Sequence, residues 1–268
     1  MNRIDARFAA LKSSRRKALV PFLTAGDPSL EATVPVMHAL VAAGADVIEL
    51  GVAFSDPMAD GPTIQRSSER ALARGAGLSY VFDCVRTFRT RDAETPVVLM
   101  GYLNPVEIRG SERFAAEAAS AGVDGVLLVD LPPEESDELR AALAAHGLAL
   151  ILLASPTTAA SRLACLCADA RGYLYYVSFA GITGADHLDA TAAGARLRTI
   201  RAQAAVPVVA GFGIKDAASA AAMAVDADGV VVGSALVSAL ADAVGVADVV
   251  ARAGGFLAPL RVALDGGA

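Results

Sequence analysis

Short apolar runs rich in valine, isoleucine and leucine recur along the whole chain, and longer alanine-rich stretches separate them. Within the runs the hydrophobicity is continuous rather than alternating, which is typical of strands covered on both faces in a parallel sheet. The pattern predicts eight strands, at Ala18–Leu23, Val47–Leu50, Val97–Met100, Val126–Val129, Leu148–Leu153, Tyr173–Val177, Val206–Ala210 and Gly229–Val232.

The stretches between these runs predict helices, the clearest being Glu31–Ala43, Glu112–Ala121, Pro133–His146, Thr158–Ala168 and Ala192–Ala204. Several of them end at a glycine in the usual stop position, namely Gly44, Gly122 and Gly147. At the N-terminus, Ile4, Phe8 and Leu11 fall on one helical face and predict a further short amphipathic helix.

A unit of strand, helix and a short Gly-Ala-Asp or Gly-Val-Asp lead into the next strand repeats along the chain. Eight such units in 268 residues predict one closed (β/α)₈ barrel, a TIM barrel with an extra N-terminal helix. No linker rich in proline or serine divides the chain, so residues 1–268 are expected to form a single domain. A doubly wound open sheet is the alternative, but the chain has no Rossmann glycine fingerprint.

Composition narrows the class of protein. A formal net charge of −6 argues against binding to the phosphate backbone of nucleic acid. The longest run without a charged residue, Ala141–Ala160, contains glycine and proline, so it predicts a helix end, a loop and a strand rather than a membrane span. The N-terminus lacks signal-peptide features, and the cysteines form neither a disulfide framework nor a metal pattern. A cytoplasmic protein without a metal is expected.

Two acidic residues are the first candidates for chemistry. Glu49 interrupts an otherwise apolar strand, and a buried carboxylate is costly unless something satisfies or uses it. Asp60 follows on a turn-rich loop that can return to the same strand end. Carboxylates in such different surroundings can divide acid and base roles. Taken alone, the two residues are better interpreted as a glutamate that caps a backbone amide and an ordinary turn aspartate. Together with the remaining motifs, a catalytic role is favoured instead.

The ends of the last two predicted strands favour an anion site. They read Gly211-Phe212-Gly213 and Gly233-Ser234, and a helix-forming segment follows Gly233. Such glycines could serve only in tight turns, but two pairs at neighbouring strand ends of a barrel favour phosphate. Apolar side chains at the same mouth would accommodate a flat hydrophobic group; they are Phe22, Met100, Leu127, Leu153 and Phe212. The residues therefore indicate a phosphorylated substrate with an apolar ring.

One long motif is the most specific in the chain: Ile48-Glu49-Leu50-Gly51 through Phe54-Ser55-Asp56-Pro57 to Asp60-Gly61-Pro62-Thr63-Ile64-Gln65. The others follow in order: Pro21-Phe22 with Thr24 and Gly26-Asp27-Pro28, Asp130-Leu131-Pro132, Gly181-Ile182-Thr183-Gly184, Gly211-Phe212-Gly213 and Gly233-Ser234. With these motifs the chain resembles, nearly end to end, the α subunit of tryptophan synthase.

The resemblance implies a carbon–carbon lyase that cleaves indole-3-glycerol phosphate to indole and glyceraldehyde 3-phosphate, with no cofactor in this chain. It implies that Glu49 is a mobile acid/base that protonates C3 of the indole ring. Asp60 would accept a hydrogen bond from the indole N–H, and Tyr175 would line the substrate near Glu49. Thr183 would belong to a mobile lid. The phosphate would be held at Gly184, Gly213, Gly233 and Ser234.

The family works as an αββα assembly in which indole passes through a tunnel to a pyridoxal-phosphate β subunit. The resemblance implies that Ala53, Asp56 and Pro57 meet this partner, with Asp56 in an ion pair across the interface. Ala53 stands where the family usually has proline, and Phe179 beside the lid also departs from the commonest pattern. Both departures concern coupling to the partner more than the chemistry.

Other functions stay open from the sequence. A free-standing indole producer without a β partner is compatible with Ala53. A mainly allosteric subunit that activates its partner is opposed by the intact pair Glu49 and Asp60. A generic phosphate-sugar isomerase would leave the apolar mouth unexplained.

Overall fold

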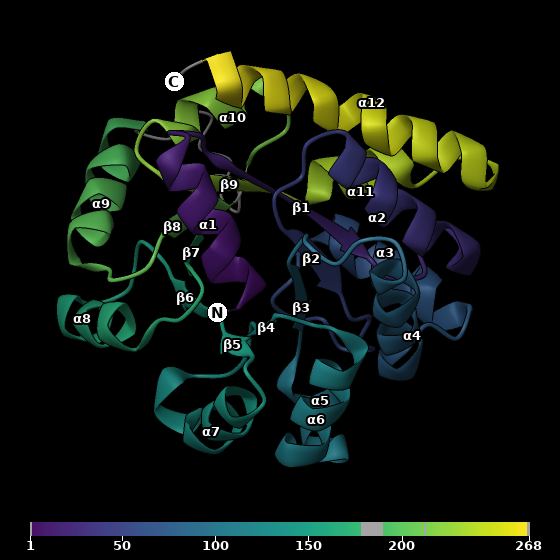
Figure 1. The fold of residues 1–268 in the computed structure, drawn as a ribbon, viewed down its shortest axis with the longest axis horizontal. Coiled ribbons are helices and arrows are strands. Elements are labelled where there is room, and N and C mark those ends of the chain that lie inside the picture. The colour runs from purple at the N-terminus through teal and green to yellow at the C-terminus, as the bar shows by residue number, and fades with distance from the viewer. Residues whose placement is uncertain (1, 178–189, 212, 267–268) are drawn as a thin grey trace.

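The apolar runs form one sheet of parallel strands in the computed structural model, which describes residues 2–177, 190–211 and 213–266 (Figure 1). The strands are β1 Ala18–Thr24, β2 Ile48–Gly51, β3 Val97–Gly101, β4 Gly125–Leu128, β5 Ala149–Leu150, β6 Leu152–Ala154, β7 Leu174–Val177, β8 Val208–Gly211 and β9 Gly229–Val232. Each predicted strand therefore overlaps an observed one.

The sheet closes through the fifth predicted strand. That segment is divided at Ile151 into β5 and β6, which pair with different neighbours: β5 with β4 and β6 with β7. The backbone N–H of Ile151 still donates to the carbonyl oxygen of Val126, at 2.8 Å. With the strand order β5-β4-β3-β2-β1-β9-β8-β7-β6, the two halves of one segment join the two edges of the sheet. The predicted (β/α)₈ barrel is confirmed, and an open sheet is excluded.

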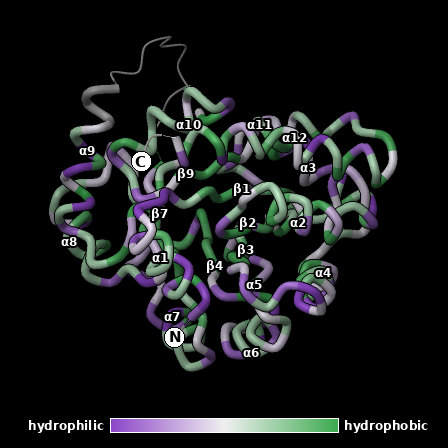
Figure 2. Tube along the Cα trace, turned by 45° about the horizontal axis from the view of Figure 1, so that its top comes forward, coloured by the Kyte–Doolittle hydropathy of each residue, from purple (hydrophilic) through white to green (hydrophobic). Residues whose placement is uncertain are grey.

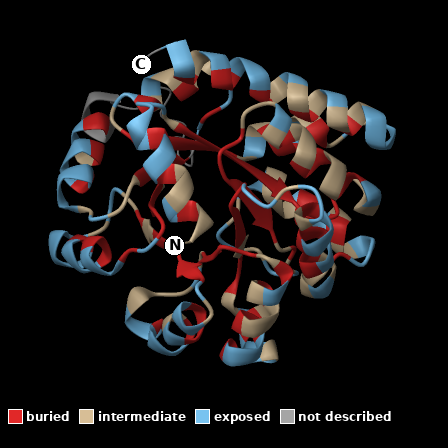
Figure 3. Ribbon diagram, viewed as in Figure 1, coloured by how far each residue is buried: buried red, intermediate tan, exposed pale blue. Residues whose placement is uncertain are grey.

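Helices surround the barrel, with their apolar faces on the strands and their polar faces outward (Figures 2 and 3). They are α1 Arg3–Ser13, α2 Thr33–Ala42, α3 Pro62–Ala73, α4 Leu78–Arg89, α5 Leu103–Arg109, α6 Ser111–Ala121, α7 Asp137–Ala145, α8 Ala160–Asp169, α9 Ala190–Gln203, α10 Ala217–Ala224, α11 Ser234–Leu240 and α12 Gly245–Gly266, with short 3₁₀ turns η1 Leu30–Ala32 and η2 Pro133–Glu135. No helix within the described residues has the length and apolar character that a membrane crossing requires.

The predicted stop glycines follow α2, α6 and α7 with positive φ angles of 102°, 94° and 73° at Gly44, Gly122 and Gly147. The N-terminal helix α1 is also confirmed. Its Ile4 and Phe8 are buried in the same cluster as the inward-facing Val98 and Tyr173. Phe8 and Tyr173 contact each other with ring centroids 5.8 Å apart. The helix α1 therefore packs against the side chains that fill the barrel interior.

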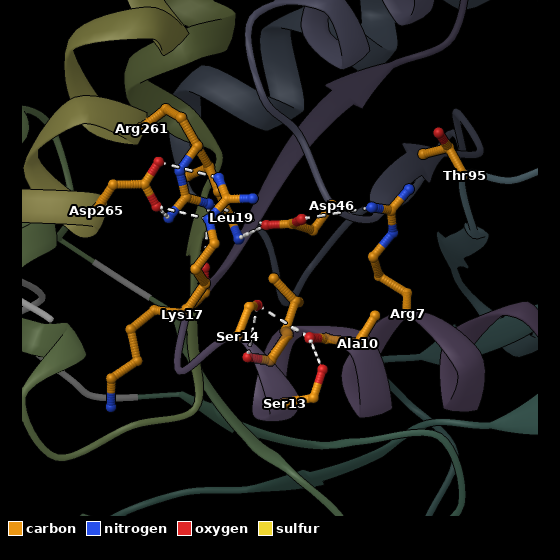
Figure 4. A network of polar contacts seen from close by, with 12 residues as sticks. Arg7, Ala10, Ser13, Ser14, Lys17, Leu19, Asp46, Thr95, Arg261 and Asp265 are labelled. Carbon is orange, nitrogen blue, oxygen red and sulfur yellow. Dashed lines mark hydrogen bonds and ion pairs between the residues drawn. The ribbon is translucent and has the colours of Figure 1, made fainter.

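The Gly-Ala-Asp and Gly-Val-Asp leads have a structural role at the N-terminal ends of the strands. Their aspartates accept a hydrogen bond from a backbone N–H at the start of a neighbouring strand: Asp46 from Leu19 at 2.9 Å and Asp124 from Val97 at 2.8 Å. Asp228, which follows Ala227 without the glycine, accepts in the same way from Val208 at 2.9 Å. Arg261 of α12 forms an ion pair with Asp46 at 3.0 Å and a second ion pair with Asp265 (Figure 4). These contacts fasten the C-terminal helix to β1 and β2.

Replacing Asp124 by asparagine is expected to lower the free energy of unfolding by about 3 kcal/mol, because two arginines would lose their charged partner at a buried position. Arg89 and Arg3 contact the Asp124 carboxylate at 2.7 and 2.9 Å, and the Asp124 side chain is 3% exposed. Urea unfolding monitored by circular dichroism measures the change. Arg113→Gln, which breaks an exposed pair with Glu117, is the control and should cost less than about 0.5 kcal/mol. Equal effects of both substitutions would contradict the prediction.

Candidate active site

A cavity of about 970 Å³ opens at the C-terminal ends of the strands. It brings together most of the described residues that the sequence singled out for catalysis or binding, although they come from different strands. Those that line it are Phe22, Glu49, Asp60, Met100, Leu153, Tyr175, Gly213, Gly233 and Ser234. The cavity thus joins two carboxylates, an apolar wall and a glycine-rich end.

The structure places the remaining predicted site residues elsewhere or does not describe them. Leu127 is fully buried in the inner cluster and is not part of the cavity lining. Thr183, Gly184 and Phe212 lie outside the described residues, as does Phe179.

The predicted partner residues lie on the loop between β2 and α3. Asp56 is exposed, Pro57 is half-buried, and Ala53 is buried in a small cluster with Ala71 and Ala76. The C-terminal end of this loop borders the cavity, because Ala59 and Asp60 contribute to the cavity lining. Its outer side is therefore available to a partner, while its inner end reaches the site.

Glu49 is in β2 and is completely buried. The hydroxyl of Tyr173 donates a hydrogen bond to its Oε1 at 2.7 Å, and Oε2 has no hydrogen-bond partner among the described residues. Burial raises the pKa of Glu49 to about 7, although the hydrogen bond from Tyr173 acts in the opposite direction. Near neutral pH the carboxyl group can therefore both donate and accept a proton.

Asp60 lies two residues before the start of α3 at Pro62, and its surroundings are more polar than those of Glu49. The hydroxyl of Tyr102 donates to Asp60 Oδ2 at 3.0 Å, and the side-chain amide of Gln65 donates to the Asp60 carbonyl oxygen at 2.9 Å. Burial raises the pKa of Asp60, and the hydrogen bond from Tyr102 partly offsets this effect. Both ends of the residue are thus held by side chains from neighbouring elements.

Tyr175 in β7 lies within electrostatic range of both carboxylates. Burial and the charges of Glu49 and Asp60 raise the pKa of Tyr175 well above its usual value, so the phenol stays protonated. A Cβ at Gly211 would lie 2.1 Å from the Tyr175 hydroxyl, so only glycine fits beside this ring. Similarly, a Cβ at Gly51 would lie 2.6 Å from the Phe22 ring, which accounts for the glycine of the Glu-Leu-Gly motif.

The two phenols that hold the carboxylates, Tyr173 and Tyr102, were not recognised as site residues from the sequence. A signal for Tyr173 existed, because it lies two positions before Tyr175 and so faces the same side of the strand. Tyr102 likewise lies two positions after Met100, at the end of β3. Neither position alone indicates which carboxylate the hydroxyl would contact.

The glycine-rich end of the cavity has features that suit an anion. Gly213 has a φ angle of 78°, and α11 begins at Ser234, directly after Gly233. The first backbone amides of a helix have no intrahelical acceptor. Arg162 also borders the cavity, but its guanidinium is paired with Glu134 at 3.0 Å. Within the described part of the chain, His, Cys, Asp and Glu side chains form no group that could hold a metal ion.

Comparison with known proteins gives one consistent result. The family model for the tryptophan synthase alpha chain matches residues 8–256. A tryptophan synthase alpha chain from Xanthomonas oryzae pv. oryzae is 73% identical over 266 residues, which is 99% of each chain. Another from Xylella fastidiosa is 72% identical over 265 residues, with 99% of each chain covered.

Solved structures give the same picture. Tryptophan synthase subunit alpha from Legionella pneumophila superimposes with a TM-score of 0.93 at 48% identity, covering 99% of each chain. A structure of Mycobacterium tuberculosis tryptophan synthase gives a TM-score of 0.88 at 36% identity, covering 98% of each chain. The similarity therefore covers the whole barrel, including the strand ends that form the cavity.

Proposed function

The chain belongs to the tryptophan synthase alpha chain family, and from this premise we propose that Glu49 and Asp60 are the groups that carry out its reaction. The chain is accordingly a carbon–carbon lyase of tryptophan biosynthesis that cleaves indole-3-glycerol phosphate to indole and glyceraldehyde 3-phosphate. One observation carries the assignment of the residues. Glu49 is fully buried, one of its carboxylate oxygens has no hydrogen-bond partner among the described residues, and it borders the same cavity as Asp60, which accepts a hydrogen bond from Tyr102.

The retro-aldol step needs a proton at C3 of indole and the loss of a proton from the glycerol hydroxyl. Glu49 supplies the first proton as its acid form and assists the loss of the second as its base form, for which a pKa of about 7 is well suited. Breaking the carbon–carbon bond returns its electron pair to the ring. Asp60 accepts the hydrogen bond of the indole N–H and stabilises the positive charge of the protonated ring.

The rest of the cavity would orient the substrate. The apolar side chains of Phe22, Met100 and Leu153 provide a wall for the indole ring. The amides near Gly213, Gly233 and Ser234 would bind the phosphate, with Gly184 added from outside the described residues. This arrangement uses residues of the chain alone, so no cofactor enters the proposed mechanism.

We propose a tryptophan synthase β subunit as the partner, in an α₂β₂ assembly that receives the indole. The exposed side of the loop at Asp56 and Pro57 supports this choice. The three free cysteines support a cytoplasmic location, and the single sheet supports one domain for the whole chain.

The experiment that tests the function is indole release from indole-3-glycerol phosphate by the purified chain, with and without the cognate β subunit.

The outcomes of this experiment separate the functions that the sequence left open. If the β subunit strongly stimulates indole release, the proposed assembly is supported. Fast indole release that is the same with and without the β subunit favours a free-standing indole producer. Ala53, which replaces the usual proline, would then contribute to the missing response. No indole under either condition would contradict the lyase function itself.

Replacing Tyr173 by phenylalanine is expected to reduce kcat about tenfold and to move the alkaline limb of the pH–rate profile upward. The hydroxyl holds Glu49 Oε1 at 2.7 Å and lowers the pKa of that carboxyl group, so its removal raises the pKa further. The reaction starts from protonated Glu49, and a higher pKa keeps this form to higher pH. Steady-state kinetics between pH 5 and about 9 test this expectation. A downward shift of the limb would contradict it.

A further inference from the structure

Tyr102 connects Asp60 with the loop that faces the proposed partner. Its hydroxyl donates to Asp60 Oδ2 at 3.0 Å and accepts a hydrogen bond from the backbone N–H of Ala59, also at 3.0 Å. Its ring contacts Phe54, with centroids 5.1 Å apart and planes at 30°. One side chain therefore touches the loop near its beginning, near its end and at the carboxylate that follows it.

Tyr102 itself occupies a fixed position. The residue is 5% exposed and follows β3 directly, and the next backbone N–H, that of Leu103, donates to Asp130 Oδ1 at 2.8 Å. The barrel strand thus provides a rigid base for the phenol. The loop on its other side is more open, since Met58 is 87% exposed and Asp56 is exposed as well.

We propose that Tyr102 is a positioning residue that sets the orientation of the Asp60 carboxylate relative to the cavity. The ring contact with Phe54 and the hydrogen bond from the Ala59 N–H hold the phenol in the place from which it donates to Asp60. The inference rests on the proposed function in that Asp60 is taken as the acceptor of the indole N–H.

The electrostatic surroundings of Asp60 make this role measurable. Tyr102 acts on the pKa of Asp60, the charge of Asp130 acts on Tyr102, and the charge of Asp60 in turn raises the pKa of Tyr175. Of these, Tyr102 donates the hydrogen bond that lowers the pKa of Asp60. Loss of the hydroxyl therefore raises this pKa, and the acid limb of kcat/KM moves to higher pH because the reaction needs ionised Asp60.

The test compares wild type with Tyr102→Phe, which keeps the ring on Phe54 and removes only the hydroxyl. Tyr80→Phe is the matched control, because its hydroxyl also makes two hydrogen bonds, to the Leu30 carbonyl oxygen and to Thr33 Oγ1, but lies outside the cavity lining. Two quantities are measured: the pKa of Asp60 by NMR of carboxyl-labelled aspartate, and the pH profile of indole release.

In Tyr102→Phe the pKa of Asp60 and the acid limb should both rise, and kcat should fall about 10- to 100-fold. Tyr80→Phe should match wild type in both measurements. An unchanged Asp60 pKa, or an acid limb that stays in place in Tyr102→Phe, overturns the proposal. The NMR measurement needs no turnover, so a wild type that releases no indole contradicts the proposed function while the positioning contact is still tested.

Discussion

Replacing Glu49 by glutamine is expected to lower kcat for indole release by about 10³-fold, within the range that a positioned acid–base group contributes. The amide has nearly the same shape but can neither protonate C3 of indole nor accept the glycerol hydroxyl proton. Tyr173 can still donate to the remaining side-chain oxygen, so the local geometry should be retained. Steady-state indole release and single-turnover measurements give the loss directly.

The same substitution should make the protein more stable at alkaline pH. Burial raises the pKa of Glu49 from 4.5 to about 7 in the folded chain. Below pH 4.5 the group is protonated in both states and causes no penalty. As the pH rises through this window, the unfolded chain loses its proton first and stability falls, until above pH 7 the full cost of an ionised buried carboxylate remains.

Glutamine avoids this cost, which is on the order of 3 kcal/mol for such a shift. Chemical unfolding of both proteins at pH 4 and pH 8 tests the sign, with the difference expected only near the higher pH. A Glu49→Gln variant that is less stable than wild type at pH 8 would contradict the predicted cost of the ionised carboxylate. A variant that is more stable than wild type at pH 8 and releases no indole would show that Glu49 lowers stability while it is required for the reaction.

Replacing Asp60 by asparagine is expected to reduce kcat/KM by about 10²-fold, the scale of removing one electrostatic contact from a developing charge. The amide oxygen can still accept the indole N–H, but it carries no negative charge to stabilise the protonated ring. Measurement of kcat and KM separately for indole-3-glycerol phosphate shows whether the loss lies in the transition state, as expected, or in substrate binding.

Two further substitutions sharpen this second test. Asp60→Glu restores the charge at a shifted position and should recover part of the activity that Asp60→Asn loses. Asp83→Asn makes the same chemical change at an exposed position of α4. Within the described residues, the Asp83 carboxylate forms an ion pair with Arg86. Activity of Asp60→Asn within a factor of about two of Asp83→Asn would remove Asp60 from the proposed mechanism.

Much of the architecture followed from local patterns in the sequence. Continuous apolar runs indicated strands covered on both faces, and Gly44, Gly122 and Gly147 marked helix ends that require a left-handed backbone. These features depend on neighbouring residues, so a single sequence contains them. Glu49 and Asp60 were also identified locally, as an acid in an apolar strand and an acid in the loop after it.

The division of the fifth strand at Ile151 could not be predicted from local patterns, because its two halves pair with strands from different parts of the chain. The tertiary structure also placed Leu127 in the inner core rather than in the cavity lining. The alternation of inward and outward residues indicates which face a side chain takes. It does not indicate how far along the barrel axis that side chain lies.

The barrel, its N-terminal helix and the pair of carboxylates can be predicted from the sequence, whereas the side chains that hold each carboxylate are known only from the folded chain. Tyr173 lies 124 positions from Glu49, and Tyr102 lies 42 positions from Asp60. Such contacts depend on the closure of the sheet, which brings the ends of distant strands to one rim. Burial is set by the same closure, and burial raises the pKa of Glu49 to about 7.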